Sequence, residues 1–246
     1  MAENTKSAIQ PSIERVTQKT FSKTILMIPT LNEQEAIRAL IAESRVCGFT
    51  RILVVDGFST DGTKNVAEQA GASVVEQDFG KGKGCGVRTG MRRLLEEDAE
   101  FLCIIDGDGT NIPADLKDMI SLVQDGAADV VLGSRTRGIR DSRSMNMLSL
   151  ASNRIVSFLL GAKFMRLFTD VQTGYWVFTR NVVRRIYPRI RSTGFEIEME
   201  LFVRIMKDGF RVSELPVGYR RRKGTTKFSF KLRIRNLYYA IRFLAS

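Results

Sequence analysis

The sequence predicts an α/β fold in which a mostly parallel, doubly wound sheet is flanked by helices. Short, continuous apolar runs alternate with helical segments from Thr24 to Leu132. Such runs suit strands that are buried on both faces, as in parallel sheets. Repeated alternation of strands and helices with short connections is typical of doubly wound folds. The 246 residues, 43% of them hydrophobic, are enough for one large domain with a buried core.

Residues 1–22 are polar and lack a sustained hydrophobic period, which predicts a flexible N-terminal tail with room for a short helix. The remainder, 23–246, is expected to form a single domain with two halves. In the first half, 23–133, strands are expected over residues 24–30, 51–55, 72–75, 101–105 and 129–133. Helices are expected between them over residues 32–47, 63–70, 87–97 and 113–124.

After Gly133 the regular alternation stops, so the second half, 134–246, is expected to be more helical and without a linker. Helices are expected over residues 145–168, 181–187, from 196 onward, and 232–245. Strand or turn structure is expected over residues 171–179 and 211–217, and a basic loop over residues 220–224.

The composition excludes several kinds of chemistry. Histidine is absent, which removes Ser-His-Asp and Cys-His mechanisms and imidazole zinc sites. Cys47, Cys85 and Cys103 show no CxxC spacing, so reduced thiols in a cytosolic protein are expected. Any catalysis must therefore use carboxylates, cationic side chains, backbone amides and metal ions.

The formal net charge of +11 is unevenly distributed along the chain. Residues 1–132 carry 14 Lys and Arg against 20 Asp and Glu, a net −6, whereas residues 133–246 carry 24 against 7, a net +17. This asymmetry indicates bound cations in the first half and an anionic partner in the second: nucleic acid, a phosphorylated substrate or an anionic membrane surface. No apolar run has the length of a membrane-spanning helix, and no signal-peptide core is present, so a soluble or peripheral protein is expected.

Polar side chains follow three expected strands of the first half. Asn32 and Glu33 follow the first strand, Asp56 the second, and Asp106 and Asp108 the strand at 101–105. In a doubly wound sheet these ends converge on one crevice, where ligands bind. Paired carboxylates favour Mg²⁺ or Mn²⁺ shared with substrate phosphates. The alternative for the last pair is an Asp-Gly turn with solvated carboxylates.

The segment from Gly80 to Gly86 contains two lysines and several glycines, and it resembles a phosphate-cradling turn. The GxxxxGK[ST] spacing of a P-loop is absent, so ATPase chemistry is not expected. A flexible linker is the alternative interpretation.

A series of motifs, in order over about residues 24–230, makes the chain resemble family 2 glycosyltransferases of GT-A fold. Within that family it resembles synthases that load a hexose onto dolichyl or another polyprenyl phosphate. The matching segments are 28–33 (IPTLNE), 54–63 (VVDGFSTDGT), 80–82 (GKG), 106–110 (DGDGT), 133–135 (GSR), 170–175 (DVQTGY), 195–198 (FEIE) and 224–227 (GTTK).

This resemblance implies roles for the donor-side residues. The nucleoside of a sugar nucleotide would be bound by Pro29, Asn32, Glu33 and Asp56, and Lys81 belongs to the Gly-Lys-Gly segment. Asp106 and Asp108 would be the DxD pair that holds Mg²⁺ or Mn²⁺ against the diphosphate.

For the acceptor side, the resemblance implies that Arg135 and Arg154 hold the lipid phosphate. Lys227 would close over the donor diphosphate, and Glu196 and Glu198 would lie near the sugar. Acids at a helix N-terminus also interact favourably with the helix dipole, which is the alternative for the two glutamates.

Two departures from mannose-loading relatives bear on the donor. Gly109-Thr110 follows Asp108 where many of those relatives have Leu-Gln, and Thr226-Lys227 replaces Ser-Lys. The Asp-Gly-Asp-Gly-Thr form looks more like archaeal S-layer glycosylation and dolichyl-phosphate glucose enzymes, which use UDP-sugars. UDP-glucose or UDP-GlcNAc is therefore the expected donor, and GDP-mannose is the alternative.

The resemblance also accounts for the missing histidine. A phosphate monoester has a second pKa near 6, so it is mostly dianionic at neutral pH and can attack the anomeric carbon directly, with inversion. The basic helices 145–168 and 228–244 would grip the phosphate at the cytoplasmic face of the membrane, with or without an anchoring subunit. Their apolar residues could instead pack on the sheet.

Three other functions remain as alternatives. A nucleotidyltransferase would carry a glycine-rich loop after the first strand, where this chain has Pro29-Thr30-Leu31-Asn32-Glu33. A nucleic-acid binder would not need acidic strand ends, and no helix-turn-helix, zinc-finger or RNP signature is present, so no nucleic-acid partner is expected. The third alternative is a glycosyltransferase with a soluble or polysaccharide acceptor, and only acceptor assays distinguish it from an enzyme that uses polyprenyl phosphate.

Overall fold

The structure is a computed structural model that describes residues 16–141, 147–223 and 230–245. Its centre is a seven-stranded sheet in the order β3-β2-β1-β4-β6-β5-β7. The strands are β1 (Thr24–Thr30), β2 (Arg51–Asp56), β3 (Ser73–Glu76), β4 (Phe101–Ile104), β5 (Val130–Ser134), β6 (Trp176–Thr179) and β7 (Val212–Pro216). All neighbouring pairs are parallel except those of β6, which runs antiparallel to β4 and β5.

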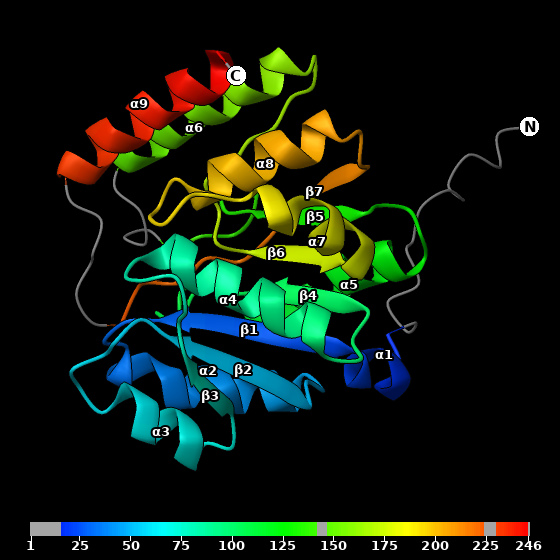
Figure 1. Ribbon diagram of the computed structural model, residues 1–246, viewed down its shortest axis with the longest axis vertical. Helices are drawn as coiled ribbons and strands as arrows, with labels where there is room; N and C mark the ends of the chain where they lie inside the picture. The colour runs from blue at the N-terminus through cyan, green and yellow to red at the C-terminus, as the bar shows by residue number, and fades with distance from the viewer. Residues whose placement is uncertain (1–15, 142–146, 224–229, 246) are drawn as a thin grey trace, which may run out of the picture.

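Helices cover both faces of the sheet (Figure 1). They are α1 (Gln18–Ser22), α2 (Gln34–Val46), α3 (Thr63–Gln69), α4 (Lys83–Glu96), α5 (Leu116–Gln124), α6 (Met147–Lys163), α7 (Arg180–Ile186), α8 (Ile197–Lys207) and α9 (Phe230–Ala245), with 3-10 turns η2 (Pro113–Asp115) and η3 (Tyr187–Arg189). One apolar core contains residues of α1, α2, α3 and α5, and the other contains residues of α4, α6, α7, α8 and α9. Helix α9 lies alongside α6 at one end of the molecule.

The predicted α/β class and the mostly parallel sheet are confirmed, with three differences in detail. The strand expected over 171–179 is limited to Trp176–Thr179 and is inserted antiparallel between β4 and β5. Helix α4 begins at Lys83, so Lys83–Gly86 belong to its first turn and not to a loop. Within the stretch expected to be a tail, α1 packs on the domain, with Phe21 in edge-to-face contact with Phe49 at 5.0 Å; residues 1–15 lie outside the described residues.

The topology brings three polar strand ends to one edge of the sheet. Thr30 at the end of β1 pairs in register with Asp56 at the end of β2. On the other side of β1 lies β4, which leads directly into Asp106. Because parallel strands end on the same side of a sheet, the segments after β1, β2 and β4 meet there, as the sequence predicts.

Candidate active site

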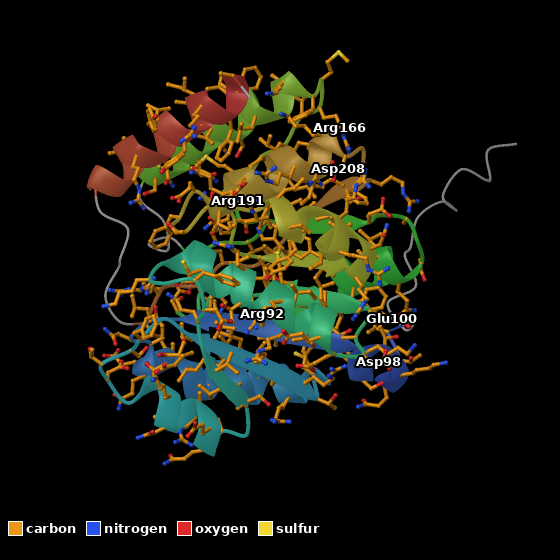
Figure 2. The ribbon with its side chains drawn as sticks, viewed as in Figure 1. Arg92, Asp98, Glu100, Arg166, Arg191 and Asp208 are labelled. Atoms are coloured by element: carbon orange, nitrogen blue, oxygen red, sulfur yellow. The ribbon has the colours of Figure 1, made fainter. Side chains whose placement is uncertain are left out.

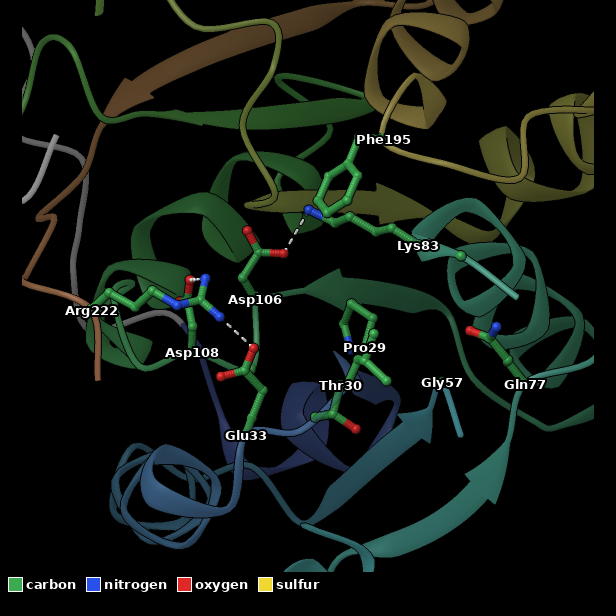
Figure 3. Close-up of a pocket in the computed structure, with 13 residues that line it drawn as sticks. Pro29, Thr30, Glu33, Gly57, Gln77, Lys83, Asp106, Asp108, Phe195 and Arg222 are labelled. Carbon is green, nitrogen blue, oxygen red and sulfur yellow. Dashed lines mark hydrogen bonds and ion pairs between the residues drawn. The ribbon is translucent and has the colours of Figure 1, made fainter. Parts of the chain in front are cut away.

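A pocket of about 220 Å³ lies at this edge of the sheet (Figure 3). The loops after β1, β2, β3 and β4, the start of α4, the loop before α8 and the segment after β7 all contribute to it. Its lining consists of Pro29, Thr30, Leu31, Glu33, Gly57, Gln77, Gly82, Lys83, Asp106, Gly107, Asp108, Phe195 and Arg222. We call it the donor pocket.

Asp106 forms a partly buried ion pair with Lys83 in the donor pocket (Figure 3). Lys83 Nζ lies 2.7 Å from Asp106 Oδ1 and 2.6 Å from Glu198 Oε1. Burial opposes both charges, but Lys83 outweighs it at Asp106 and holds the pKa of that carboxyl below its usual value. At Glu198 burial prevails and raises the pKa. Gly174 leaves the space that the Asp106 carboxylate needs, because a Cβ there would lie 2.2 Å from Oδ2.

Asp108 and Glu33 share Arg222 at the opposite side of the pocket. Arg222 Nη1 lies 2.7 Å from Asp108 Oδ2, and Nη2 lies 2.6 Å from Glu33 Oε1. The other oxygen of Asp108 accepts the Thr110 hydroxyl at 2.7 Å and the Thr110 amide at 3.1 Å. The segment that carries Arg222 is held beside the β4 loop by the Arg220 amide, which donates to Thr110 O at 2.7 Å.

Asp56 is fully buried and does not line the pocket, although the next residue, Gly57, does. Its Oδ2 accepts the Ser59 amide at 2.9 Å and lies 3.8 Å from Lys64 Nζ. Within the described part of the chain, Oδ1 has no hydrogen-bond partner. A buried carboxylate oxygen without a donor is costly, so this atom is suited to accept a donor from a ligand.

Pro29, in the last residues of β1, and Asn32, in the loop after it, take different positions. Pro29 lines the pocket. Asn32 does not, and its Oδ1 accepts the Thr60 amide at 2.8 Å while its own amide donates to Ser59 Oγ at 2.8 Å. Asn32 therefore joins the loops after β1 and β2, and its positive φ of 51° is one that Asn tolerates better than most residues.

The two lysines of the glycine-rich segment differ in position. Lys83 points into the donor pocket with its side chain 14% exposed. Lys81 is exposed and lies over the Phe58 ring at 6.0 Å. The segment contains two overlapping Gly-Lys-Gly triplets, and the one that contributes its lysine to the site is 82–84.

Arg135 is held rigidly just outside the donor pocket. Its Nε and Nη2 donate to the two oxygens of Asp170, both at 2.7 Å, and Nη2 also donates to Gln172 O at 2.9 Å. Asn153 of α6 donates to the same carboxylate at 2.7 Å. Arg135 is one of the cations that lower the pKa of Asp106, which indicates that the two lie near each other. Arg154 is exposed on α6, and Lys227 lies outside the described residues.

Glu196 and Glu198 face different pockets, although Glu196 immediately precedes α8 and Glu198 lies in its first turn. Glu198 contacts Lys83, whereas Glu196 does not line the donor pocket. Glu196 Oε1 accepts the amides of Thr193 at 3.3 Å and Gly194 at 2.9 Å, and the residue lines a second pocket.

The Asp106 and Asp108 carboxylates fit a divalent cation that a bound ligand also coordinates, but not a cation that is coordinated by protein side chains alone. Among the described residues there is no group of three or more His, Cys, Asp or Glu that could hold a metal. Asp106 and Asp108 supply two hard carboxylates to the same pocket, and phosphate oxygens and waters would complete the coordination of Mg²⁺ or Mn²⁺. Since Lys83 and Arg222 now neutralise these carboxylates, metal binding requires the ion pairs to rearrange.

The lining residues to which the sequence assigned no individual role include Gln77, Lys83, Phe195 and Arg222. Lys83 and Arg222 belong to segments that the sequence did single out, the glycine-rich run and the basic loop. Which cation of each segment faces the pocket depends on tertiary contacts. Gln77 follows the edge strand β3, and no motif in or directly after that strand indicated a functional residue.

Comparison with known proteins identifies relatives of this chain. The Glycosyl transferase family 2 profile matches residues 25–187. Glycosyltransferase AglJ of Haloferax volcanii is 36% identical over 194 residues, which cover 79% of this chain and 62% of that protein. The dolichyl-phosphate hexose transferase of the same organism is 32% identical over 216 residues, covering 86% of this chain and 89% of that one. The chain thus spans less than two thirds of the first relative.

Solved structures support the same fold. Glucosyl-3-phosphoglycerate synthase from Mycobacterium tuberculosis, in complex with Mn²⁺, UDP and glucosyl-3-phosphoglycerate, superposes with a TM-score of 0.71 at 15% identity. The superposition covers 98% of this chain and 87% of that one. At this identity the likeness is one of fold, and it confirms the predicted GT-A architecture.

Proposed function

Because this chain belongs to glycosyl transferase family 2, we propose that it transfers a hexose from a nucleotide sugar to dolichyl or another polyprenyl phosphate. The observation that carries the proposal is the donor pocket, where Asp106 and Asp108 both line the pocket just after β4 and each pairs with a cation. The name of the dolichyl-phosphate hexose transferase relative supports this acceptor class.

The diphosphate of the donor is proposed to lie between Lys83 and Arg222. Both cations are held by carboxylates on opposite sides of one pocket, so an incoming diphosphate can compete for them with charge-assisted hydrogen bonds. Asp106 and Asp108, released from these pairs, would hold Mg²⁺ or Mn²⁺. The metal would supply neutralisation of the charge that develops on the leaving nucleoside diphosphate. The Mn²⁺ and UDP in the M. tuberculosis neighbour support a divalent metal.

The base of the nucleotide is proposed to lie at the Asp56 end of the pocket. Gly57 and Gln77 line the pocket, and Asp56, which directly precedes Gly57, has a buried oxygen without a hydrogen-bond partner among the described residues. A uracil N–H is a suitable donor for that oxygen, which supports a UDP-sugar such as UDP-glucose or UDP-GlcNAc. Guanine also carries N–H donors, so GDP-mannose remains the competing donor.

Inversion at the anomeric carbon requires only alignment of an acceptor that is already nucleophilic. A phosphate monoester is mostly dianionic near pH 7, so the absence of histidine from the chain is no obstacle. Arg135 is proposed to orient the acceptor phosphate, because Asp170 fixes its guanidinium close to Asp106. Asp170 then acts on the acceptor only through Arg135.

The lipid acceptor is proposed to approach along α6 and α9, with the protein bound peripherally at the cytoplasmic face of a membrane. Large apolar side chains are exposed on these two adjacent helices: Met147, Leu148, Ile155 and Phe158 on α6, and Leu237, Tyr238 and Ile241 on α9. Contiguous exposed apolar surface is uncommon on soluble domains and marks interaction sites. In the described part of the chain, no helix combines the length and apolar character required to cross a bilayer.

A donor and acceptor panel tests the proposal. Purified protein is incubated with Mg²⁺ or Mn²⁺, a short-chain polyprenyl phosphate and UDP-glucose, UDP-GlcNAc or GDP-mannose, and the glycolipid is identified by mass. Glycolipid from a UDP-sugar supports the full proposal, and glycolipid from GDP-mannose alone replaces the donor. Transfer to 3-phosphoglycerate, offered in parallel, without transfer to the lipid would overturn the acceptor class.

A further inference from the structure

A second pocket of about 410 Å³ lies between α8, α9 and residues 191–196, outside the donor pocket. It is lined by Arg191, Ser192, Thr193, Glu196, Glu200, Val203, Arg204, Lys207, Tyr239, Arg242 and Phe243. Figure 2 shows Arg191 in the segment that leads toward α8. None of these residues takes part in the chemistry proposed above.

The lining carries an excess of positive charge. Four cations, Arg191, Arg204, Lys207 and Arg242, face two carboxylates, Glu196 and Glu200. In the portions of the chain described, neither Arg191 nor Arg242 forms an ion pair. The guanidinium of Arg191 donates to the carbonyls of Pro188 and Ile190, at 2.8 and 3.0 Å.

The two carboxylates are already committed to holding the wall of the pocket. Glu200 accepts the amides of Arg191 and Ser192 and pairs with Arg204 at 2.6 Å. Glu196 accepts the amides of Thr193 and Gly194, and its second oxygen lies 3.7 Å from Arg235 of α9. Because these contacts use the negative charge to fix the backbone, the excess of arginine charge is available to a ligand.

Helix α9 presents one side to the second pocket and another to the outer surface. At 100° per residue, Arg235, Tyr239, Arg242 and Phe243 lie on the side of α9 that faces α8, and Leu237 and Ile241 lie on the outer side. Arg242 lines the pocket and is itself exposed to solvent. Arginine binds phosphate through its planar fork of N–H donors.

We propose that this second pocket binds a phosphate group, carried either by an anionic lipid headgroup or by a soluble phosphate compound. The pocket shares its wall with the donor pocket, since Thr193 O accepts the Cys85 amide of α4 at 3.3 Å and Phe195 lines the donor pocket. The inference depends on this lining alone and does not require the proposed glycosyl transfer.

Calorimetric titration with inorganic phosphate and with dihexanoyl phosphatidic acid below its micellar concentration tests the proposal. Arg242→Ala should weaken binding about tenfold, as expected for loss of one charged hydrogen-bonding group, and Arg242→Lys should weaken it less. Arg184→Ala, which removes an exposed arginine of α7, should leave it unchanged.

Tighter binding of phosphatidic acid than of inorganic phosphate assigns the lipid headgroup, and the reverse order assigns a soluble phosphate. Either order of affinity supports the site if Arg242→Ala weakens binding of the tighter ligand. Equal affinity in the wild type and Arg242→Ala means an adventitious ion only and overturns the proposal. Loss of binding in Arg222→Ala alone also overturns it, because the phosphate then lies in the donor pocket.

Discussion

Lys83 and Asp106 form a partly buried ion pair, 2.7 Å between Nζ and Oδ1, that connects the first turn of α4 to the loop after β4. Burial alone would lower the pKa of Lys83, but Asp106 and Glu198 outweigh it and raise that pKa above its usual value. Lys83 therefore stays charged throughout the physiological range. The pair keeps a carboxylate ionised in a pocket where, without a partner, it would favour protonation.

Replacement of Lys83 with methionine should lower kcat/KM at least a hundredfold, in line with removal of a preorganised charged donor from a transition state. Lys81→Met is the matched control, since the two lysines are two residues apart and Lys81 is exposed. It should change kcat/KM less than about threefold, because its charge is screened by solvent. Steady-state kinetics with the preferred donor measure both. Equal losses would show that the pocket position of Lys83 is irrelevant.

Asp108→Ala should abolish transfer, a loss of about a thousandfold or more, while the protein stays folded. The change removes one of the two carboxylates proposed to hold the metal and leaves Arg222 paired with Glu33. Activity is measured across a Mn²⁺ titration, and folding by circular dichroism. Normal turnover in this variant would remove the metal role of Asp108.

Gly84→Ala should destabilise the protein by about 1–3 kcal/mol, because a Cβ at this position would lie 2.4 Å from Ser192 O. Gly86→Ala, two residues later in the same helix, would place its Cβ 3.3 Å from the side-chain oxygen of Gln77 and not against backbone. Higher helix propensity should make that second variant neutral or about 0.5–1 kcal/mol more stable. Urea denaturation compares the two, and equal effects would mean that the 192–194 loop moves freely.

The first half of the fold was predictable because its signals are local. Continuous apolar runs mark β1, β2 and β4, and the polar residues that follow them reach the same edge in any parallel sheet. The insertion of β6 between β4 and β5 was not predictable, since nothing in the four residues Trp176–Thr179 specifies an antiparallel partner.

The site was predictable to the level of segments, but not always of side chains. Asp106 and Asp108 follow from one strand end, whereas the choice of Lys83 over Lys81 depends on where α4 begins. The pairing of Arg222 with Asp108 joins positions 114 residues apart in the chain. Such contacts arise from packing, which a single sequence does not encode locally.

Glu200→Gln should lower the free energy of unfolding by about 2 kcal/mol at pH 7, as expected for weakening charged hydrogen bonds to buried amides. Burial alone would raise the pKa of Glu200, but hydrogen bonds from Ser192, Arg191 and Arg204 outweigh it and hold that pKa below its usual value. The stabilisation is therefore complete above the unfolded-state pKa, near 4.5, and is lost as the pH falls through the folded-state value. Denaturation at pH 7 and at pH 3 should show the difference between wild type and variant shrinking on acidification. A constant or growing difference would contradict this linkage.

Peripheral membrane binding through α6 and α9 predicts that polar substitutions on their outer face reduce affinity for anionic vesicles. Leu237 and Ile241 are 46% and 58% exposed on one side of α9. The double variant Leu237→Ser/Ile241→Ser should bind vesicles of phosphatidylcholine and phosphatidylglycerol at least tenfold more weakly, because burial of each side chain contributes about 1.5–3 kcal/mol when complete.

Val46→Ser is the matched control, since Val46 is 89% exposed but lies at the end of α2, away from α6 and α9. It should bind vesicles as the wild type does. Binding should also weaken as salt rises, because basic residues of the second half contribute through screened electrostatics. Co-sedimentation measures all three proteins. If the double variant and Val46→Ser bind alike, the exposed apolar residues of α9 do not contact the bilayer, and the lipid acceptor must reach Arg135 by another face.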